Sequence, residues 1–313
     1  MVTIGTWNLE NLFRPGTESG PSGEKEYTAK LDTLAATIGE IDPDVLAVQE
    51  VGSPEALSDL VEQLDGAWHT EIAEPDDRGI RVATLSRMPA DGVAQVVDFP
   101  PRIGPVTVDD AGATIDRLGR AGLHLTVTVG GRGIDLVTAH LKSKLLSYPG
   151  GRFSPRDEDE RARYATYALH RRAAEAAGVR TYVTGLLGDD PDRAVIVAGD
   201  LNDDAEAATT QILLGPPGSE IGSGGFDRPD QGDAQRLWNL APLIPEDERY
   251  TRIYRGRREL VDHILVSHSL LDALQEAGTG PGQPPSIADT PTARRDEPGS
   301  DHRPVVVRLD VSR

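Results

Sequence analysis

The most informative segment of the chain is Ala194-Val-Ile-Val-Ala-Gly-Asp-Leu-Asn202. It begins with an apolar run, which is typical of a strand buried on both faces, and Gly199 ends that run. Asp200 and Asn202 follow, and alternation along an extended chain predicts that they lie on the same side. A carboxylate and a carboxamide at the end of a core strand suit a site for a metal ion, a water molecule and a phosphate group. The alternative is a strand followed by an Asx turn, because Asp, Asn and Gly are common turn residues.

The composition limits the chemistry that the chain can use. It has 313 residues and no Cys, which excludes disulfides, thiolate chemistry and Cys-based zinc sites. Any bound metal must therefore have oxygen or nitrogen ligands, and oxygen-rich sites favour hard ions such as Mg²⁺, Mn²⁺ or Ca²⁺. The net charge of −19 gives no long-range attraction to a nucleic acid backbone, so nucleic acid binding would need a local basic patch.

The chain reads as one domain, residues 1–313, with no membrane span. It contains no short internal repeat, no stretch with the composition of a domain linker, and no apolar run long enough to cross a bilayer. Val2–Trp7 reads as a strand with no basic segment before it, so we expect a cytoplasmic protein, although a chain trimmed of a leader would read the same. Two Gly/Pro-rich stretches, Gly215–Gln235 and Ala277–Gly299, are predicted to be long surface loops.

The remaining pattern predicts many strands and few helices. A long helix is expected over Pro155–Ala177, with Ser154 as its N-cap and Gly178 just past its end. Apolar spacing predicts a helix over Tyr27–Ile41, and Ser53-Pro54 opens another. Strands are expected at Val2–Trp7, Val45–Val48, Val82–Ser86, Val93–Phe99, Leu123–Val129, Ile134–Ala139, Val195–Ala198, Val261–Val266 and Pro304–Leu309. Because strands and helices do not alternate regularly, we predict sheets packed on each other with helices outside.

Polar residues suited to phosphate chemistry end or follow several of these strands. They are Asn8, Glu10, Glu50, His140, Asp200, Asn202, Asp262, Asp301 and His302. Strand ends are where a rigid sheet presents a site. The motifs that contain them are Thr6–Glu10, Asp42–Glu50, Gly79–Arg87, Ala139–Leu141, Gly199–Asn202, Val261–Val266 and Ser300–Pro304. In this order, and over nearly the whole chain, the motifs resemble the endonuclease/exonuclease/phosphatase superfamily. Within it, Asn8–Phe13 and His140–Lys144 resemble bacterial nuclease-like members.

The resemblance implies both an architecture and a metal site. The architecture is an α/β fold, a four-layer α/β sandwich with two mostly antiparallel mixed β-sheets face to face and helices on both outer faces. The cofactor is Mg²⁺ or Mn²⁺, and Glu50 matches the principal metal ligand. The other residues that the resemblance places at the metal site are Asn8, Glu10, Asp200, Asn202 and Asp301.

The resemblance also assigns catalytic roles to residues of the strand-end set. Asp200 matches the residue that orients or deprotonates the attacking water, and Asn202 matches one that holds a phosphate oxygen. Asp262 would hydrogen-bond His302, and a buried carboxylate beside an imidazole raises its pKa above about 6.5. His302 would then be cationic when phosphate binds.

His140 matches a second phosphate-facing histidine of the family, a candidate for protonating the leaving oxygen. In DNase I-like members this histidine has a glutamate partner on the strand that corresponds to Val82–Ser86. Here that region offers Arg78 and Arg81 instead. Simple phosphate binding is therefore the favoured role for His140.

Local basic clusters offset the overall acidity near these motifs. Lys142 and Lys144 follow His140, while Arg252 and Arg255 belong to an arginine-rich segment interleaved with tyrosines. We expect these four cations to bind phosphate or substrate; the alternative is a solvated charged surface. Arginines interleaved with aromatic residues suit a nucleic acid strand, whereas two or three arginines can equally grip a small phosphorylated molecule.

The sequence therefore predicts a divalent-metal-dependent phosphodiesterase, nuclease-like, that cleaves phosphodiester bonds by in-line attack of water. One alternative is a phosphatase or phosphodiesterase that acts on a small phosphorylated molecule or a lipid headgroup. A second alternative is a non-catalytic module that binds phosphorylated ligands. The scaffold alone does not choose between them, because one fold hosts several chemistries.

Overall fold

The computed structural model describes residues 1–188, 190–215, 221, 235–288 and 293–311. Its core consists of two six-stranded sheets. The first has the order β15 (Leu274–Thr279), β17 (Val305–Leu309), β1 (Val2–Leu12), β2 (Val45–Val51), β4 (Arg81–Ser86), β3 (His69–Ile72). The second has the order β11 (Leu237–Asn239), β14 (Asp262–Ser267), β10 (Ala194–Asp200), β9 (Arg132–His140), β8 (Arg117–Val129), β5 (Gly92–Asp98). Only the pairs β1–β2 and β9–β10 are parallel in these sheets, so both are mixed and mostly antiparallel.

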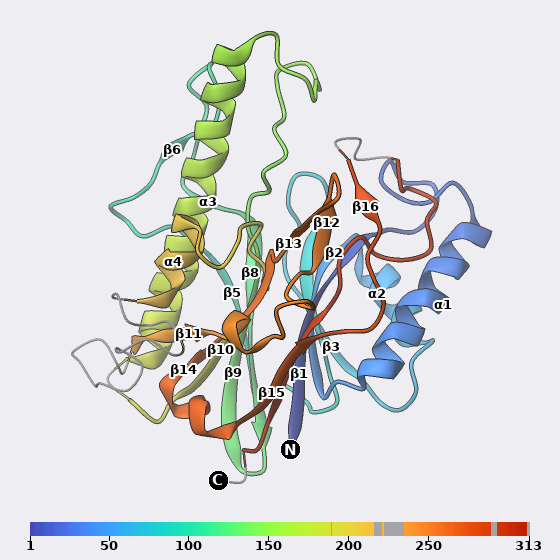
Figure 1. Ribbon diagram of the computed structural model, residues 1–313, viewed down its shortest axis with the longest axis vertical. Coiled ribbons are helices and arrows are strands. Elements are labelled where there is room, and N and C mark those ends of the chain that lie inside the picture. The colour runs from blue at the N-terminus through green and yellow to red at the C-terminus, as the bar shows by residue number, and fades with distance from the viewer. Residues whose placement is uncertain (189, 216–220, 222–234, 289–292, 312–313) are drawn as a thin grey trace.

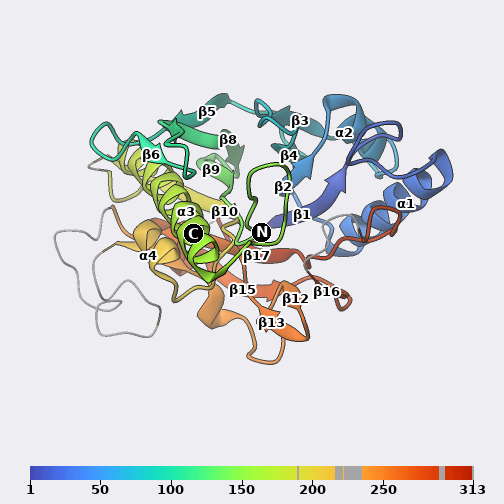
Figure 2. The ribbon, with the colours of Figure 1, turned by 90° about the horizontal axis from the view of Figure 1, so that it is seen from above.

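Helices cover the outer face of each sheet. Helices α1 (Glu24–Ile41) and α2 (Pro54–Val61) pack on the first sheet, and α3 (Glu158–Leu187) and α4 (Ala208–Leu214) pack on the second. Figure 2 shows these layers from above, with the blue helices on one side and the green and yellow helices on the other. The predicted four-layer sandwich is therefore confirmed.

Short elements lie between the main ones, and several of them border the strand ends (Figure 1). They are β6 (Val106–Thr107), β7 (Thr114–Ile115), β12 (Arg252–Tyr254), β13 (Arg257–Glu259), β16 (Ser286–Ile287) and the 3₁₀ helices η2 (Ala241–Leu243) and η3 (His268–Ala273). Strands β13, β12 and β16 form a small sheet of their own.

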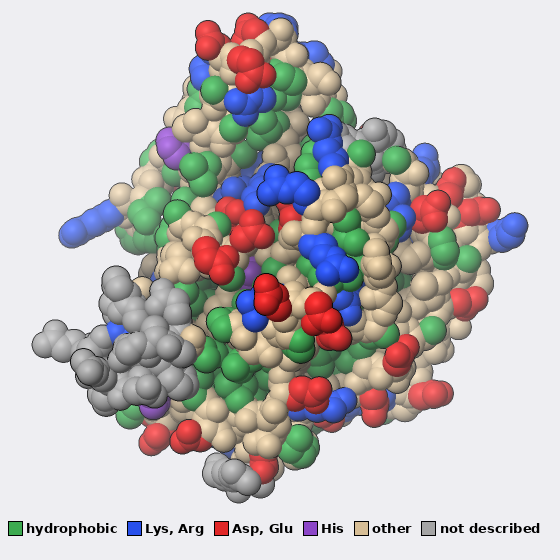
Figure 3. All heavy atoms as spheres, viewed as in Figure 1, with side chains coloured by type: hydrophobic (Ala, Val, Ile, Leu, Met, Phe, Trp, Pro, Cys, Tyr) green, Lys and Arg blue, Asp and Glu red, His purple; other side chains and the backbone are tan. Residues whose placement is uncertain are grey.

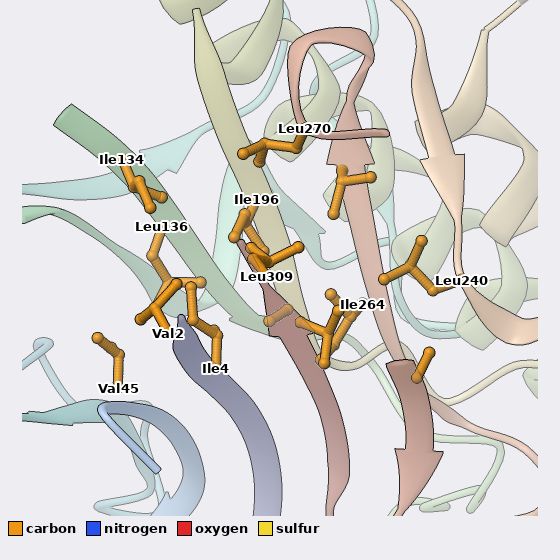
Figure 4. Packing of buried hydrophobic residues seen from close by; sticks show 14 of the residues in the cluster. Val2, Ile4, Val45, Ile134, Leu136, Ile196, Leu240, Ile264, Leu270 and Leu309 are labelled. Atoms are coloured by element: carbon orange, nitrogen blue, oxygen red, sulfur yellow. The ribbon is translucent and has the colours of Figure 1, made fainter. Parts of the chain in front are cut away.

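Alternation along β10 shows why an apolar strand is needed at the centre of the second sheet. Ile196 faces the other sheet and packs with Ile4 of β1 and Leu136 of β9, as Figure 4 shows. Val195 and Val197 face the opposite way and pack in the layer below α3. Both faces of this strand are thus buried, which removes its apolar side chains from water and fixes its position.

The long helix differs from its predicted bounds. It begins three residues later and ends ten residues later than expected. The later start follows from its N-cap, which is Asp157 and not Ser154, because the Asp157 side chain accepts a hydrogen bond from the Glu160 N–H. Gly178 lies inside the helix. A Cβ added there would lie 2.7 Å from the Asp98 carbonyl oxygen and 2.8 Å from Leu118 Cδ1, so the glycine permits close packing on the sheet.

The two Gly/Pro-rich stretches differ in how much of them the structure describes. Most of Gly215–Gln235 lies outside the described residues. The prediction that Ala277–Gly299 is entirely loop is wrong, since its start belongs to β15, with Gly278 opposite Val306 of β17, and β16 lies within it. β15 is an edge strand with a polar sequence, so it lacks the apolar run that marked the central strands.

In the part of the chain that the structure describes, no helix combines the length and the apolar character needed to cross a membrane.

Candidate active site

Three polar residues lie side by side at one edge of the second sheet. The register places His140 of β9 opposite Asp200 of β10, and Asp200 opposite Asp262 of β14. All three side chains are buried. Ends of three neighbouring strands, far apart in sequence, thus form one continuous row of ionisable groups.

His302 joins this row from the loop before β17. Its Nδ1 lies 2.7 Å from Asp262 Oδ2, as the sequence predicted, and the Ser300 hydroxyl accepts a hydrogen bond from its backbone N–H at 3.0 Å. Burial alone would lower the pKa of His302, but the carboxylates of Asp262 and Asp301 outweigh it and raise that pKa to about 10. The imidazole is therefore a cation at neutral pH.

Asp200 is held by two contacts and is protonated more easily than an ordinary aspartate. Its Oδ2 accepts a hydrogen bond from Asn8 Nδ2 at 3.0 Å, and its Oδ1 accepts one from the Asn202 backbone N–H at 2.9 Å. Burial, and then the negative charge of Asp262, raises the pKa of Asp200 from 3.8 to about 7. A carboxylate with this pKa is suited to accept a proton near neutral pH.

Asn202 does not continue the strand, so the predicted alternation with Asp200 is wrong. Strand β10 ends at Asp200, and Asn202 has a left-handed backbone with φ of 55°. Its N–H bonds back to the Asp200 carboxylate, as in an Asx turn, while its Nδ2 donates to the Leu141 carbonyl at 3.0 Å. The turn expected as the alternative is therefore present, and both residues still line the same cavity.

His140 is neutral in this environment. Burial, reinforced by the positive charges of Arg120 and His302, lowers its pKa well below 6.5. Its Nε2 lies 3.5 Å from Asp200 Oδ2, and its buried Nδ1 has no hydrogen-bond partner among the described residues. The absence of a carboxylate on β4 that the sequence indicated is thus reflected in an unpartnered ring nitrogen.

Glu50 and Asn8 connect the first sheet to this row. Asn8 Nδ2 lies 3.2 Å from Glu50 Oε1, and the Asn11 backbone N–H donates to Glu50 Oε2 at 2.9 Å. The Asn8 Oδ1 accepts a hydrogen bond from the Glu10 N–H at 2.9 Å. The Asn8 side chain therefore orients both Glu50 and Asp200, two carboxylates from different sheets.

Glu10 does not face solvent. Its carboxylate forms two hydrogen bonds with the Arg294 guanidinium, at 2.8 and 3.0 Å. Burial, together with the charge of Asp301, raises the pKa of Glu10 to about 7. Sequence reasoning missed Arg294, because it lies in a segment read as loop and carries no motif of its own.

Several of these residues have a left-handed backbone conformation, which residues other than glycine rarely adopt. Glu10, Asn11, Glu50 and Asn202 have φ values of 50°, 54°, 63° and 55°. Such left-handed conformations are costly for residues other than glycine and persist where the surrounding structure holds them. Their clustering at the ends of β1, β2 and β10 marks this edge of the sheets as a functional candidate.

The structure brings two of the four predicted phosphate-binding cations into the cavity wall. Lys144 and Arg252 line it, whereas Lys142 and Arg255 do not. The Lys142 ammonium points into its own loop and donates to the carbonyls of Ser143 and Leu145 at 2.9 and 2.7 Å. Buried lysines pair with such backbone acceptors because an isolated ammonium is costly to bury.

Arg120 is a basic residue of the cavity that the sequence did not single out. It comes from β8, and its guanidinium donates to the His140 and Leu141 carbonyls, both at 3.0 Å. A third hydrogen bond, to the Asp76 carboxylate, has a length of 3.3 Å. Its place in β8, far from every motif, offered no sequence signal.

The strand-end residues line one cavity of about 480 Å³. The residues that border it include Asn8, Glu10, Glu50, Arg120, His140, Lys144, Asp200, Asn202, Arg252, Asp301 and His302. Asp262 supports it from behind. In Figure 3, basic and acidic side chains mix in the middle of the face shown, below the projecting top of the molecule.

The oxygen donors fit a hard divalent cation. Glu10, Glu50 and Asp301 border the cavity together, and burial, followed by the negative charge of Asp301, raises the pKa of Glu10. Carboxylate oxygens are the ligands that Mg²⁺ and Mn²⁺ prefer. Among the described residues, Asp200, Asp262 and His302 also bring three potential ligand atoms within 4.8 Å of one another. Because His302 there is a cation bonded to Asp262, that group suits proton transfer better than metal binding.

Comparison with solved structures shows the same fold in several proteins. The human Nocturnin catalytic domain with bound sulfate has 15% identity and a TM-score of 0.57, with 99% of this chain and 94% of that chain covered. A mannosyl-6-phosphatase from Bacteroides thetaiotaomicron has 16% identity and a TM-score of 0.57, covering 99% and 100%. Truncated Caenorhabditis elegans TDP2 has 16% identity and a TM-score of 0.54, covering 98% and 96%.

Sequence comparison gives the family. No curated protein shows a significant match to the chain. The sequence model described as "Endonuclease/Exonuclease/phosphatase family" matches residues 5–302, which include every strand-end residue discussed above. The chain belongs to the endonuclease/exonuclease/phosphatase family.

Proposed function

We propose that this chain is a divalent-metal-dependent hydrolase of phosphate esters, with Mg²⁺ or Mn²⁺ as cofactor and residues 1–313 as one catalytic domain. The observation that carries the proposal is that Asp200, Asp262 and His302 lie together within this row of ionisable groups. In it the pKa of Asp200 is raised to about 7 and the pKa of His302 to about 10. Titratable neighbours whose pKa values are separated in this way supply a base and a cation at the same pH.

Each residue of the row then has a definite part in hydrolysis. Asp200 accepts a proton from the attacking water and orients it, while Asn8 keeps the carboxylate in place. His302 donates from Nε2 to a phosphoryl oxygen, because its Nδ1 is occupied by Asp262. A fixed donor of this kind stabilises the charge that develops in the transition state.

The remaining residues position the substrate and the metal. Glu50 and Asp301 would hold the cation, with Glu10 at its side. When bound, a divalent cation polarises a phosphoryl oxygen and stabilises the leaving oxygen. His140, which is neutral, offers a hydrogen bond to phosphate and does not serve as a general acid, since its pKa lies well below 6.5.

The charges around the cavity favour a small organic phosphate over a nucleic acid strand. Lys144 lies 2.9 Å from Asp203, and Arg252 lies 2.9 Å from Glu259. The positive charges of Lys144 and Arg252 are therefore largely offset by neighbouring carboxylates, and the whole chain has a net charge of −19. A polyanion gains affinity chiefly from uncompensated positive charge, so it would gain little here.

A nuclease-like phosphodiesterase is the second candidate, and one feature favours it. Tyr254 lines the cavity, and the Arg252 guanidinium lies 5.6 Å from the Tyr254 ring centroid. An aromatic ring beside an arginine suits base stacking combined with phosphate contact.

A substrate panel tests the proposed function. The full chain would be incubated with plasmid DNA, RNA, bis(p-nitrophenyl) phosphate and p-nitrophenyl phosphate, with Mg²⁺, with Mn²⁺ or with chelator. We expect metal-dependent hydrolysis of at least one small ester, and a loss of kcat/KM on the order of 10²–10⁴ in Asp200→Asn, since the base is removed.

The matched control is Asp272→Asn, an exposed aspartate in η3, which should keep wild-type kcat/KM. Turnover that survives chelation, or that Asp200→Asn leaves unchanged, would contradict the mechanism. Cleavage of DNA or RNA but of neither small ester would favour the nuclease. Binding without turnover of any substrate would favour a non-catalytic module.

A further inference from the structure

The cavity has an apolar side as well as a catalytic one. Six of the apolar or aromatic residues that border the same cavity as Asp200 and His302 are here called the apolar wall: Ile80, Leu146, Tyr148, Phe153, Tyr254 and Ile287. They come from separate parts of the chain, namely the segment before β4, the connection between β9 and α3, and the strands β12 and β16. Their convergence on one cavity is a property of the fold.

The wall is built before any ligand arrives. The connection between β9 and α3 runs as a long green loop up to the top of α3 in Figure 1. Tyr148 anchors it, because its ring centroid lies 5.0 Å from that of Tyr164 on α3 and its backbone N–H donates to Arg152. Arg152 in turn lies 2.8 Å from Glu160 of α3. A rigid, preformed surface binds ligand without the cost of ordering a loop.

Phe153 stands out on this loop because it is half exposed. Its relative exposure is 51%, and of the large apolar side chains that the described residues expose, it is the one that borders the cavity. Apolar surface exposed to water at the edge of a cavity favours ligand binding, because a ligand that covers it removes it from water.

We infer that the apolar wall is a subsite for the alcohol portion of the phosphate ester, and that this portion is an apolar group of about ring size. The inference rests on the proposed function for its phosphate end, which the catalytic residues would hold. A polar sugar in the same position would lose hydration without gaining hydrogen bonds from Ile80, Leu146 or Phe153. A cavity of about 480 Å³ also suits a small ligand.

Binding of non-hydrolysable phosphonates tests the subsite without using catalysis. The full chain with Mg²⁺ would be titrated by NMR with methylphosphonate, benzylphosphonate and the phosphonate analogue of ribose 5-phosphate, in which a CH₂ group replaces the ester oxygen. We expect benzylphosphonate to bind about tenfold more tightly than the other two, as expected for partial burial of one ring. Equal affinities, a preference for the ribose phosphonate, or no binding of benzylphosphonate would overturn the subsite.

Two variants with a matched control assign the effect to the wall. Phe153→Ala and Leu146→Ala should each reduce the benzyl preference by roughly threefold or more and leave methylphosphonate affinity unchanged. Leu169→Ala removes a similarly exposed side chain (44%) that lies on α3 and does not border the cavity, so it should keep the full preference. A preference unaffected by both wall variants would also overturn the assignment. Because Phe153 is half exposed, its truncation leaves the fold intact.

Failure of the subsite and failure of the proposed function give different results. If benzylphosphonate shows its preference and Phe153→Ala removes it while no ester is hydrolysed, the subsite stands and the hydrolase proposal fails. If esters are hydrolysed while all phosphonates bind alike, the hydrolase proposal stands and the subsite fails.

Discussion

At the scale of single residues, the site depends on how each carboxylate is paired. Asp262 is fully buried and bonds directly to the His302 cation, whereas Asp200 is bonded by amide groups and interacts with that cation only through its charge. This difference explains why one carboxylate stabilises an imidazolium while its neighbour becomes a base. The sequence predicted the Asp262–His302 pair, but the raised pKa of Asp200 follows first from burial, which only the folded structure shows.

Removal of the Asp262 charge should move both limbs of the pH profile. In the wild type, kcat/KM should rise as Asp200 loses its proton near pH 7 and fall as His302 loses its proton near pH 10. In Asp262→Asn the carboxylate that raises both pKa values is gone, so both limbs should shift to lower pH.

The measurement is kcat/KM against pH, with an NMR titration of the His302 ring as a second readout. An alkaline limb and an imidazole titration that stay in place would show that Asp262 does not set the charge of His302.

At the scale of elements, close packing and buried polar contacts hold α3 and the second sheet together. Gly178 lets α3 approach β5 and β8 closely. At the opposite end of the sheet from the cavity, Asp135 of β9 accepts hydrogen bonds from His124 of β8 at 2.9 Å and from Arg193, before β10, at 2.6 Å. These contacts support the strands that carry His140 and Asp200.

Two glycines of the same helix should respond in opposite ways to alanine. In Gly178→Ala the new methyl group meets the Asp98 carbonyl and Leu118, so we expect a loss of about 1–3 kcal/mol in the free energy of unfolding. In Gly185→Ala the added Cβ has nothing within 4 Å, so helix propensity should make the variant equal to or up to about 1 kcal/mol more stable than wild type. Urea unfolding measures both, and similar values for the two would contradict the packing argument.

Asp135 should make stability depend on pH in the acid range. Burial would raise its pKa, but hydrogen bonds, those from His124 and Arg193 chief among them, hold the pKa well below 3.8 in the folded chain. The group therefore adds stability above about pH 3.8, and that stability is lost as the pH falls further.

Asp135→Asn should cost about 2–3 kcal/mol in urea unfolding at pH 7, and the difference from wild type should shrink below pH 4. The control is Glu276→Gln, whose exposed pair with Arg308 should contribute at most about 1 kcal/mol. A difference at pH 7 no larger than that of the control would contradict the role assigned to Asp135.

At the scale of the whole molecule, the sandwich gathers carboxylates from both sheets at one edge. Glu10 and Glu50 come from the first sheet and Asp200 from the second, and all border the same cavity in a chain of net charge −19. Like charges held together oppose folding, so a bound cation should stabilise the folded state as a whole.

Divalent metal should therefore raise the melting temperature. At a Mg²⁺ or Mn²⁺ concentration 100 times the Kd, the free energy of unfolding should increase by about 2.7 kcal/mol, and a chelator should reverse this increase. Glu50→Gln should lose most of this rise, whereas Glu276→Gln should keep it. Differential scanning calorimetry makes the comparison, and a rise that is equal in all three proteins would place the metal elsewhere.

The amino-acid sequence is sufficient to predict nine of the twelve strands of the two main sheets, with their apolar cores and the polar residues at their ends. Local patterns suffice for these features because alternation and motif spacing are short-range properties. They failed where tertiary packing overrides the local signal, as for Gly178, which reads as a helix end, and Asn202, which leaves the strand.

Which charged groups meet depends on tertiary packing. The pairing of Glu10 with Arg294, the turning of Lys142 into its own loop and the entry of Arg120 from β8 join residues that no local pattern connects. The same holds for the apolar wall, in which Ile80 and Ile287 lie far apart in sequence. Pairing, burial and the pKa values that follow are properties of the folded surroundings, so they arise only once the two sheets have packed together.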